Sequence, residues 1–435
     1  MAKSSLNNGD TNFWDLGVAD FQPRSFDQSS LYDVAIVGTG FSGLATATFL
    51  ARQGLSVIVL DAQKVGFGAS SRNGGMVGPS FHKLGMAGLT QKYGADLAHR
   101  ILKAGIDALD FFEQVIETEK LDCDFRLTGR FRGARNPAAL EAMQRECTRL
   151  NSEVGLPFEM VGADGVREQM GSDHYCGGVI YPRDGGANPK KLVNELARRA
   201  EGYGAHIRDH CAVQAIRPVA GRFQLETAVR PVIARQVVIA TNGYSDRGVP
   251  TMQSRVMPIW VTVAATRALG ADAVRQMSPK LRMHGETGRL FVWSRPSPDG
   301  ERFIFGGRFS HPDMAIAEKR SRVANTVKRI FGQITSNDIE HVWHGKVAYT
   351  MDHAPHINSI DGMWHIGGYC GSGLTRSIYF AHKLACKITG QDGGDSAFDE
   401  LLFPRVPLQF LSPLVTGALT RYYGMSDAID GWRAR

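Results

Sequence analysis

The sequence lacks any long hydrophobic run. Nowhere in its 435 residues is there a stretch of about 18 consecutive apolar residues, the least that a membrane-spanning helix requires. The opening stretch MAKSSLNNGDTNFWD contains neither an apolar core nor a cleavage site, the two features of a secretory signal. We therefore expect no membrane span and a cytoplasmic location.

Cysteine is scarce and scattered. No cysteine belongs to a CxxC pair or to a His/Cys cluster with metal-ligand spacing. The six residues are Cys123, Cys147, Cys176, Cys211, Cys370 and Cys386. This scatter excludes a cysteine-ligated metal site and predicts buried or free thiols in a reducing compartment.

Runs of like charge are also missing. The chain has 50 basic and 43 acidic residues, a net charge of +7, spread along its length without a run of about five like charges. We therefore expect no nucleic acid partner, and a mild preference for anionic ligands such as a pyrophosphate or a carboxylate. A hydrophobic content of 43% is typical of a globular protein.

The first positive signal is a complete βαβ pattern. An apolar run at 34–37 leads into a GxGxxG motif at 38–43, and a helical stretch follows at 44–53. A second apolar run at 57–60 ends in Asp61. This order of strand, glycine turn, helix, strand and terminal acid is typical of a dinucleotide-binding unit.

Each glycine of the motif is needed for a different physical reason. Gly38 permits the tight turn, Gly40 lets the backbone approach a pyrophosphate, and Gly43 lets the helix pack against the strand. Asp61 is placed to accept hydrogen bonds from an adenosine ribose. A glycine turn without a ligand is the alternative, but it leaves Asp61 unexplained.

Four later segments favour FAD over NAD. They are a glycine- and serine-rich loop at 66–76, an alternating strand at 212–216 after a helix at 189–203, a buried strand at 236–243, and a strand and glycine loop at 364–374 before a helix. The loop could cradle a cofactor or be a flexible surface loop. An NAD(P)-linked enzyme with a flavin partner would need a second GxGxxG unit, and the sequence has none.

The order of these motifs resembles a known family. Together with WHGKVAYTMDHAPHI at 343–357, they resemble the D-amino-acid-oxidase-like FAD-dependent oxidoreductases. The resemblance is greatest to the gamma-glutamylputrescine oxidase branch, which typically carries an aromatic segment such as Phe13-Trp14 near its N-terminus. It spans nearly the whole chain.

The resemblance implies an α/β fold, α+β overall, with a Rossmann-type FAD-binding domain and a second, mainly antiparallel-sheet substrate domain. Strand-like runs at 259–264, 290–293 and 302–308, with a hairpin signal at 296–300, fit the second domain. The predicted division gives the cofactor domain residues 31–81, 176–245 and 343–395, the substrate domain 82–175 and 246–342, an N-terminal segment 1–30, and a C-terminal tail 396–435.

The resemblance also implies that FAD is bound by residues of these motifs. They are Gly38, Gly40, Phe41, Ser42, Gly43, Asp61, Ala62, Ser70, Ser71, Arg72, Asn73, Gly74, Gly75, Met76, Val213, Ala240, Thr241, Gly243, Gly368, Gly371, Ser372, Gly373, Leu374 and Thr375. Sarcosine oxidase attaches its flavin to a cysteine in the segment that matches 346–350, which has no cysteine here, so we expect noncovalent FAD.

The implied reaction is hydride transfer to flavin N5 from the carbon beside a neutral amine, giving an imine that hydrolyses to a carbonyl compound. The candidate substrate-contacting residues are Trp260, Phe291, Arg308, Tyr349 and Thr375. A guanidinium at 308 could clamp a carboxylate or form a surface salt bridge. Trp260, Phe291 and Trp293 could form an apolar wall or pack in the core.

The electron acceptor stays open between oxygen, which would give peroxide, and a quinone or carrier. The oxygen-activating lysine of sarcosine oxidase aligns with Ile304, and its carboxylate-contacting lysine aligns with Thr375. The first replacement argues against a fast reaction with oxygen, and the second argues against sarcosine as the substrate. The segment 403–423 could contact a membrane or partner, or pack on the body as a tail. A non-catalytic flavin-binding module is a further alternative.

Overall fold

The computed structural model describes residues 9–288 and 292–407. Its first sheet contains the predicted βαβ unit: β1 (Tyr32–Val37), α1 (Phe41–Arg52) and β2 (Val57–Leu60). The two strands are parallel, and their apolar residues are buried because helices or loops cover both faces. The helix begins at Phe41, earlier than the predicted start at 44, because the last residues of the glycine motif already form its first turn.

The first sheet has the strand order β17-β18-β11-β1-β2-β8, and the hairpin of β9 and β10 extends from β11. Its further strands are β8 (His206–Arg208), β9 (Val213–Val219), β10 (Arg222–Thr227), β11 (Val232–Ile239), β17 (His356–Ile360) and β18 (Met363–Gly367). The central strands β18, β11, β1, β2 and β8 run parallel. Their carboxyl ends therefore meet at one edge, where ligands bind in sheets of this kind.

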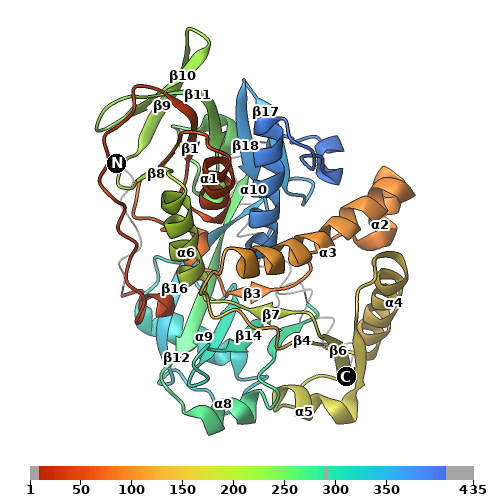
Figure 1. Ribbon diagram of the computed structural model, residues 1–435. Helices are drawn as coiled ribbons and strands as arrows, with labels where there is room; N and C mark the ends of the chain where they lie inside the picture. Colours follow the sequence, from red (N-terminus) through yellow and green to blue (C-terminus); the bar gives the residue numbers. More distant parts are fainter. Residues whose placement is uncertain (1–8, 289–291, 408–435) are drawn as a thin grey trace.

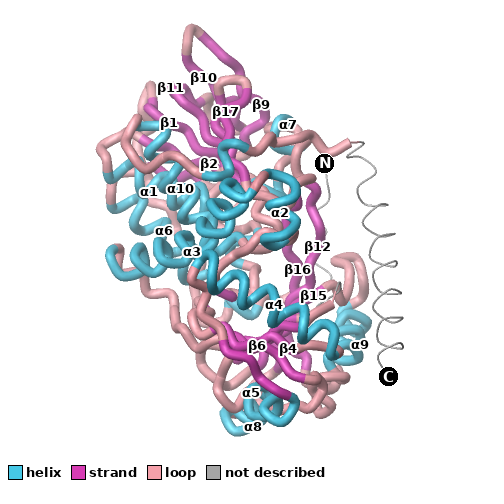
Figure 2. The backbone as a smooth tube through the Cα atoms, turned by 90° about the vertical axis from the view of Figure 1, so that its right-hand side faces the viewer, coloured by secondary structure: helices cyan, strands magenta, loops and turns pink. Residues whose placement is uncertain are grey.

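Helices cover one face of this sheet. Helix α1 packs between α6 (Pro189–Gly202) and α10 (Gly373–Thr389), and α3 (Ala95–Thr118) contacts α10. Figure 2 shows these helices gathered beside the first sheet. Both predicted helices, at 189–203 and from 375, agree with α6 and α10 to within two residues.

The second sheet lies below the first in the view of Figure 1, in the order β16-β12-β15-β14-β13-β4-β6-β5. Its strands are β4 (Arg130–Gly133), β5 (Glu159–Gly162), β6 (Gly177–Tyr181), β12 (Met257–Thr266), β13 (Met283–Glu286), β14 (Trp293–Pro296), β15 (Phe303–Gly307) and β16 (Ile339–Tyr349). All neighbours are antiparallel except β4 and β13. The predicted hairpin joins β14 to β15.

The remaining described elements precede, follow or connect these strands along the chain. The α-helices are α2 (Gly85–Tyr93), α4 (Pro137–Val154), α5 (Val166–Met170), α7 (Pro250–Gln253), α8 (Ala271–Met277) and α9 (Ile316–Val327), and the short strands β3 (Met76–Val77) and β7 (Gly185–Gly186) pair with each other. The 3₁₀ helices are η1 (Phe13–Asp15), η2 (Ala69–Ser71), η3 (Ala163–Gly165), η4 (Asn242–Tyr244) and η5 (Ala397–Glu400).

Two strands cross the predicted domain boundaries. Strand β6, in the predicted cofactor range 176–245, and β16, most of which falls in 343–395, both belong to the second sheet. Sheet membership depends on partners far away in the sequence, so an apolar run cannot assign it. The division into two domains stays a prediction, and its boundaries at 176 and 343 do not follow the sheets.

The mixed α/β architecture with a second, mainly antiparallel sheet confirms the predicted fold class. Among the described helices, none combines the length and apolar character needed to cross a membrane. Most of the C-terminal tail, from residue 408, lies outside the described residues, as do 290 and 291 of the predicted strand at 290–293.

Candidate active site

A cavity of about 800 Å³ lies between the strand ends of the first sheet and the second sheet. On one side it is lined by residues that follow β1, β2 and β11 and by the start of α1. On the other side it is lined by residues of β4, β12, β14 and β16. The cavity thus continues from the glycine motif into the space between the two sheets.

The glycine motif leaves no room for side chains. A Cβ on Gly38, whose φ is +112°, would lie 2.9 Å from the carbonyl oxygen of Ala240, and one on Gly43 would lie 1.9 Å from the oxygen of Gly38. A Cβ on Gly40 would meet Ser70 Oγ at 2.9 Å. These positions form a cradle of bare backbone that fits a pyrophosphate.

Asp61 is fixed at the nucleotide end of the cavity. Its Oδ2 accepts hydrogen bonds from the Thr39 backbone N–H at 2.8 Å and from Thr39 Oγ1 at 2.6 Å, and its Oδ1 accepts one from Gln63 N at 2.9 Å. Burial raises the pKa of this carboxyl, and the Thr39 bonds oppose the rise. Both oxygens keep acceptor capacity for the hydroxyls of a ribose.

Replacing Asp61 with alanine is expected to weaken FAD binding about tenfold or more, because a hydrogen bond to a charged group contributes about 1.5–3 kcal/mol. Titration of the apoprotein with FAD, followed by flavin fluorescence, measures the dissociation constant. Asp33→Ala is the matched control, since that aspartate on β1 bonds to Ser56 and does not line the cavity. Equal weakening in both variants would remove the ribose role of Asp61.

The loop at 66–76 is held by its own side chains. Ser70 Oγ accepts from the Phe41 N–H at 3.0 Å, and Arg72 Nε donates to the Phe67 carbonyl at 2.7 Å. Asn73 Nδ2 donates to the Ser70 carbonyl at 2.8 Å. A loop tied by this many internal bonds does not fit the alternative of a flexible surface loop.

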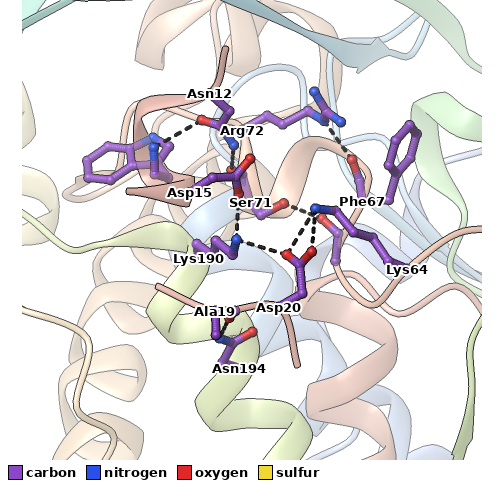
Figure 3. Close-up of polar contacts among 12 residues, drawn as sticks. Asn12, Asp15, Ala19, Asp20, Lys64, Phe67, Ser71, Arg72, Lys190 and Asn194 are labelled. Carbon is purple, nitrogen blue, oxygen red and sulfur yellow. Dashed lines mark hydrogen bonds and ion pairs between the residues drawn. The ribbon is translucent and has the colours of Figure 1, made fainter. Parts of the chain in front are cut away.

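The N-terminal residues 10–20, here called the N-terminal clamp, hold the same loop from outside. Asn12 Nδ2 donates to the Ser71 carbonyl at 3.0 Å (Figure 3), and Trp14 Nε1 donates to the Asn73 carbonyl at 2.8 Å. The clamp thus donates hydrogen bonds to two backbone carbonyl oxygens of the loop, those of Ser71 and Asn73. The paired aromatic residues were the only sequence signal for this segment, and they did not reveal the contact.

Ion pairs fasten the clamp at both ends. Asp10 contacts Lys319 Nζ at 2.5 Å and His344 Nδ1 at 2.7 Å, and both partners have fully buried side chains. Burial raises the pKa of Asp10, but its bonds to His344 and Lys319 outweigh burial and hold that pKa below its ordinary value. At the other end, Asp15 and Asp20 share the buried Lys190 of α6 (Figure 3).

The second glycine loop, at 368–374, lies against the start of α1. Tyr369 OH and Ser42 Oγ are hydrogen-bonded at 2.6 Å, and the Gly368 N–H donates to Asn242 Oδ1 at 2.9 Å. Thr375, in the first turn of α10, lies with its Oγ1 3.5 Å from the Gly78 carbonyl. The loop and the N-terminal turn of α10 therefore line the cavity beside the start of α1.

The structure brings most of the predicted cofactor residues together on the cavity wall. Those that line it are Gly38, Gly40, Phe41, Ser42, Asp61, Ala62, Ser70, Arg72, Asn73, Gly74, Met76, Val213, Ala240, Thr241, Gly371, Ser372, Gly373, Leu374 and Thr375. Those that lie behind the wall are Gly43, Ser71, Gly75, Gly243 and Gly368. They pack or bond to neighbouring backbone, as Ser71 Oγ does by donating to the Gly66 carbonyl at 2.5 Å.

Of the predicted substrate contacts, only Thr375 lines the cavity in the described structure. Trp260 does not, because side chains alternate along β12 and its neighbours Val261 and Val263 supply the wall. Arg308 does not line it either, whereas the Trp293 ring, which covers Gly306, does.

Of the two remaining candidates for substrate contact, the structure describes Tyr349 but not Phe291. Tyr349 lies behind Gly371, where its hydroxyl would be 3.8 Å from an added Cβ, and Lys83 Nζ lies 4.3 Å from the centre of its ring. Phe291 lies outside the described residues.

Charged residues of the second sheet line the cavity and were not predicted. They are Arg130, Arg132, Glu286 and Lys346, joined by Asp184 just before β7. Burial raises the pKa of Asp184 to about 6 even though Arg130 opposes the rise, and burial lowers the pKa of Lys346. Lys346 Nζ lies between the rings of Tyr244 and Trp260, 5.3 and 5.1 Å from their centres.

The fold and the cavity define a dinucleotide-binding α/β protein with its ligand site between two sheets. Residues 33–387 match the model of the DAO family, described as FAD dependent oxidoreductase, and the chain belongs to that family. FAD is therefore its cofactor and oxidation–reduction its chemistry, which confirms the predicted resemblance.

Named relatives agree with this assignment. The chain is 26% identical to gamma-glutamylputrescine oxidoreductase of Escherichia coli over 93% of this chain and 95% of that one. It is 28% identical to the probable oxidoreductase OrdL of Rhizobium meliloti over 91% and 92% of the two chains. Among solved structures it is similar to glycine oxidase from Geobacillus kaustophilus, with a TM-score of 0.68 at 20% identity over 87% of this chain and 100% of that one.

Proposed function

We propose that this chain oxidises the carbon–nitrogen bond of an amine or amino acid, giving an imine that hydrolyses to a carbonyl compound. The observation that carries the proposal is the wall of the cavity, where a dinucleotide cradle continues into a chamber lined by apolar and charged side chains. In the described part of the chain, no histidine lines this wall. The names of the relatives, gamma-glutamylputrescine oxidoreductase and glycine oxidase, supply the substrate class.

The residues divide the cavity into two ends. Gly38, Gly40 and Asp61 would hold the adenosine diphosphate part of a noncovalent FAD, and the loop at 371–375 would hold the isoalloxazine ring. The N-terminal turn of α10 favours negative charge at that ring. Bound FAD supplies the acceptor for a hydride from the carbon beside the amine nitrogen.

Positive charge on the cavity wall favours the neutral form of the substrate amine. Arg132 and Lys346 line the same cavity, whereas Arg130 is paired with Asp184, and nearby positive charge disfavours an ammonium ion. The substrate nitrogen is therefore bound neutral, its proton left in solvent, so that its lone pair can form the imine as the hydride leaves. This arrangement needs no protein base, and no histidine lines the part of the cavity wall that the structure describes.

Anaerobic mixing with a panel of amines tests the proposal. The panel holds polyamines and their gamma-glutamyl forms, N-methyl amino acids, D-amino acids and glycine. Bleaching of the flavin band near about 450 nm by one of them is expected and identifies the substrate class. A holoenzyme that no member of the panel bleaches would contradict the proposal.

Admitting air to the bleached enzyme distinguishes the two electron acceptors. Rapid recovery with peroxide indicates an oxidase. Slow recovery favours the second candidate, a dehydrogenase that passes electrons to a quinone or carrier. One observation supports this second candidate: Ile304 is completely buried in a core cluster with Phe13 and Trp14, so no cation occupies that position. A cytoplasmic location stays a prediction.

A further inference from the structure

Five consecutive carbonyl groups of the loop at 66–76, the last of them that of Gly75, accept hydrogen bonds from outside the loop. The N-terminal clamp donates to two of them, and Trp343 Nε1 donates to a third at 2.8 Å. Arg295 of β14 holds the last two, because its Nη1 donates to the carbonyls of Gly74 and Gly75 at 3.2 and 2.8 Å. A single buried side chain thus fixes the end of this loop.

Bare backbone makes room for the Arg295 guanidinium. A Cβ on Gly75 would lie 2.8 Å from Arg295 Nη1, and a Cβ on Gly186 would lie 2.5 Å from the same atom. This nitrogen also donates to the Ala187 carbonyl at 3.1 Å. Strand alternation places Trp293, which lines the cavity, on the same side of β14. Arg295 does not line the cavity, so the backbone of the loop separates its charge from the cavity.

The positive charge of Arg295 is not balanced by a neighbour. Its donors reach only backbone carbonyls, and it forms no ion pair with any residue that the structure describes. The carboxylate of Asp124 acts on it from a distance, but Asp124 is itself paired with Lys191 at 2.8 Å. Burial lowers the pKa of Arg295 to about 10, which leaves the guanidinium charged at neutral pH. A buried cation without a counter-ion favours negative charge on the other side of the loop.

FAD in the cavity gains such a charge when it is reduced. A hydride adds to the neutral isoalloxazine ring and leaves it as the anion FADH⁻. Fixed positive charge in a site shielded from water stabilises an anion that forms nearby. The charge of Arg295 therefore favours the reduced form of the cofactor over the oxidised form.

We propose that Arg295 is a positioning residue that sets the reduction potential of the bound flavin. It holds the peptide groups of Gly74 and Gly75 in place and keeps one unbalanced positive charge behind them. The inference goes beyond the proposed amine oxidation, because it concerns the cofactor and needs no substrate. Arg295 acts through the loop and through its charge, without contact to the reacting atoms.

Equilibrium reduction of the holoenzyme against a dye of known potential, with no amine present, tests the proposal. Arg295→Gln keeps a donor for the loop but removes the charge, so the potential of the flavin should become more negative. The ratio of the dissociation constants of reduced and oxidised FAD should rise about tenfold, the effect of a unit charge across about 10 Å at an effective dielectric constant of about 20. Titration of the apoprotein with each form of FAD measures this ratio even in a variant that binds flavin weakly.

Two further variants separate charge from loss of packing. Arg295→Lys keeps the charge and loses the fork, so it should leave the ratio near that of the wild type while FAD dissociates faster. Arg255→Gln is the matched control. Arg255 also donates to backbone carbonyls, those of Thr251 and Phe403, but neither of these residues lines the cavity. Circular dichroism establishes that each variant is folded.

The outcomes are distinct from those of the amine panel. A rise of the ratio in Arg295→Gln, with Arg295→Lys and Arg255→Gln close to the wild type, supports the proposal even in an enzyme that no amine reduces. In that case only the amine oxidation fails. An unchanged ratio in Arg295→Gln, or an equal rise in Arg295→Lys or in Arg255→Gln, overturns the proposal even if an amine bleaches the flavin.

Discussion

Gly43→Ala is expected to abolish FAD binding and to lower the stability of the protein by several kcal/mol. The added Cβ would lie 1.9 Å from the carbonyl oxygen of Gly38, and backbone on both sides leaves neither atom free to move. The helix would have to separate from β1, which would break the cradle for the pyrophosphate. Flavin content after purification and denaturant unfolding measure the two effects.

Gly202→Ala is the control for this prediction. Gly202 is the last residue of α6, its φ is ordinary, and an added Cβ meets nothing within 4 Å. Alanine there should leave FAD binding unchanged and stability unchanged or slightly higher. Retention of flavin by Gly43→Ala would show that the backbone at 38–43 can rearrange and would contradict the packing argument.

Asp10→Ala is expected to destabilise the protein by about 3–5 kcal/mol, the usual cost of removing one partner from a buried ion pair. Lys319 would remain fully buried, with the Pro312 carbonyl at 2.7 Å as its remaining side-chain partner among the described residues, and His344 Nδ1 would lose the carboxylate that it contacts. Release of the clamp should also raise the rate of FAD dissociation, because Asn12 and Trp14 would no longer hold the loop at 66–76.

Asp96→Ala is the matched control, because Asp96 is an exposed partner of Arg100 on α3 and such pairs contribute about 0–1 kcal/mol. Denaturant unfolding and the rate of flavin release measure the two variants side by side. If Asp10→Ala loses stability while its flavin release stays at the wild-type rate, the clamp would be a purely structural element.

The sequence predicted the parts of the fold that are encoded locally. The glycine motif, α1, β2 and Asp61 occupy one continuous segment, and each residue type has a conformational or packing reason that requires no distant partner. The helices α6 and α10 were recognisable for the same reason, since Asn188 and Pro189 mark the start of one and a glycine-rich turn the start of the other.

The substrate side depends on strand pairings between distant segments. Arg130 and Arg132 reach the cavity because β4 pairs with β13, more than 150 residues later, and nothing near residue 130 indicates that partner. Arg308 was the more attractive candidate in the sequence, but it does not line the cavity, whereas Trp293 of the neighbouring strand does. Whether a side chain of a strand lines a cavity therefore cannot be predicted until the neighbouring strands of the sheet are known.

The N-terminal clamp has a consequence for the order of events during synthesis. Residues 10–20 leave the ribosome before the partners that hold them in place, which include residues near 64, 71–73, 190–194, 319 and 341–344. The clamp therefore cannot close until almost the whole second sheet has been translated. The ion pairs of Asp10 with Lys319 and His344 can form only after β16, the last strand of the second sheet, has been made, so the loop at 66–76 gains its full outer support late in synthesis.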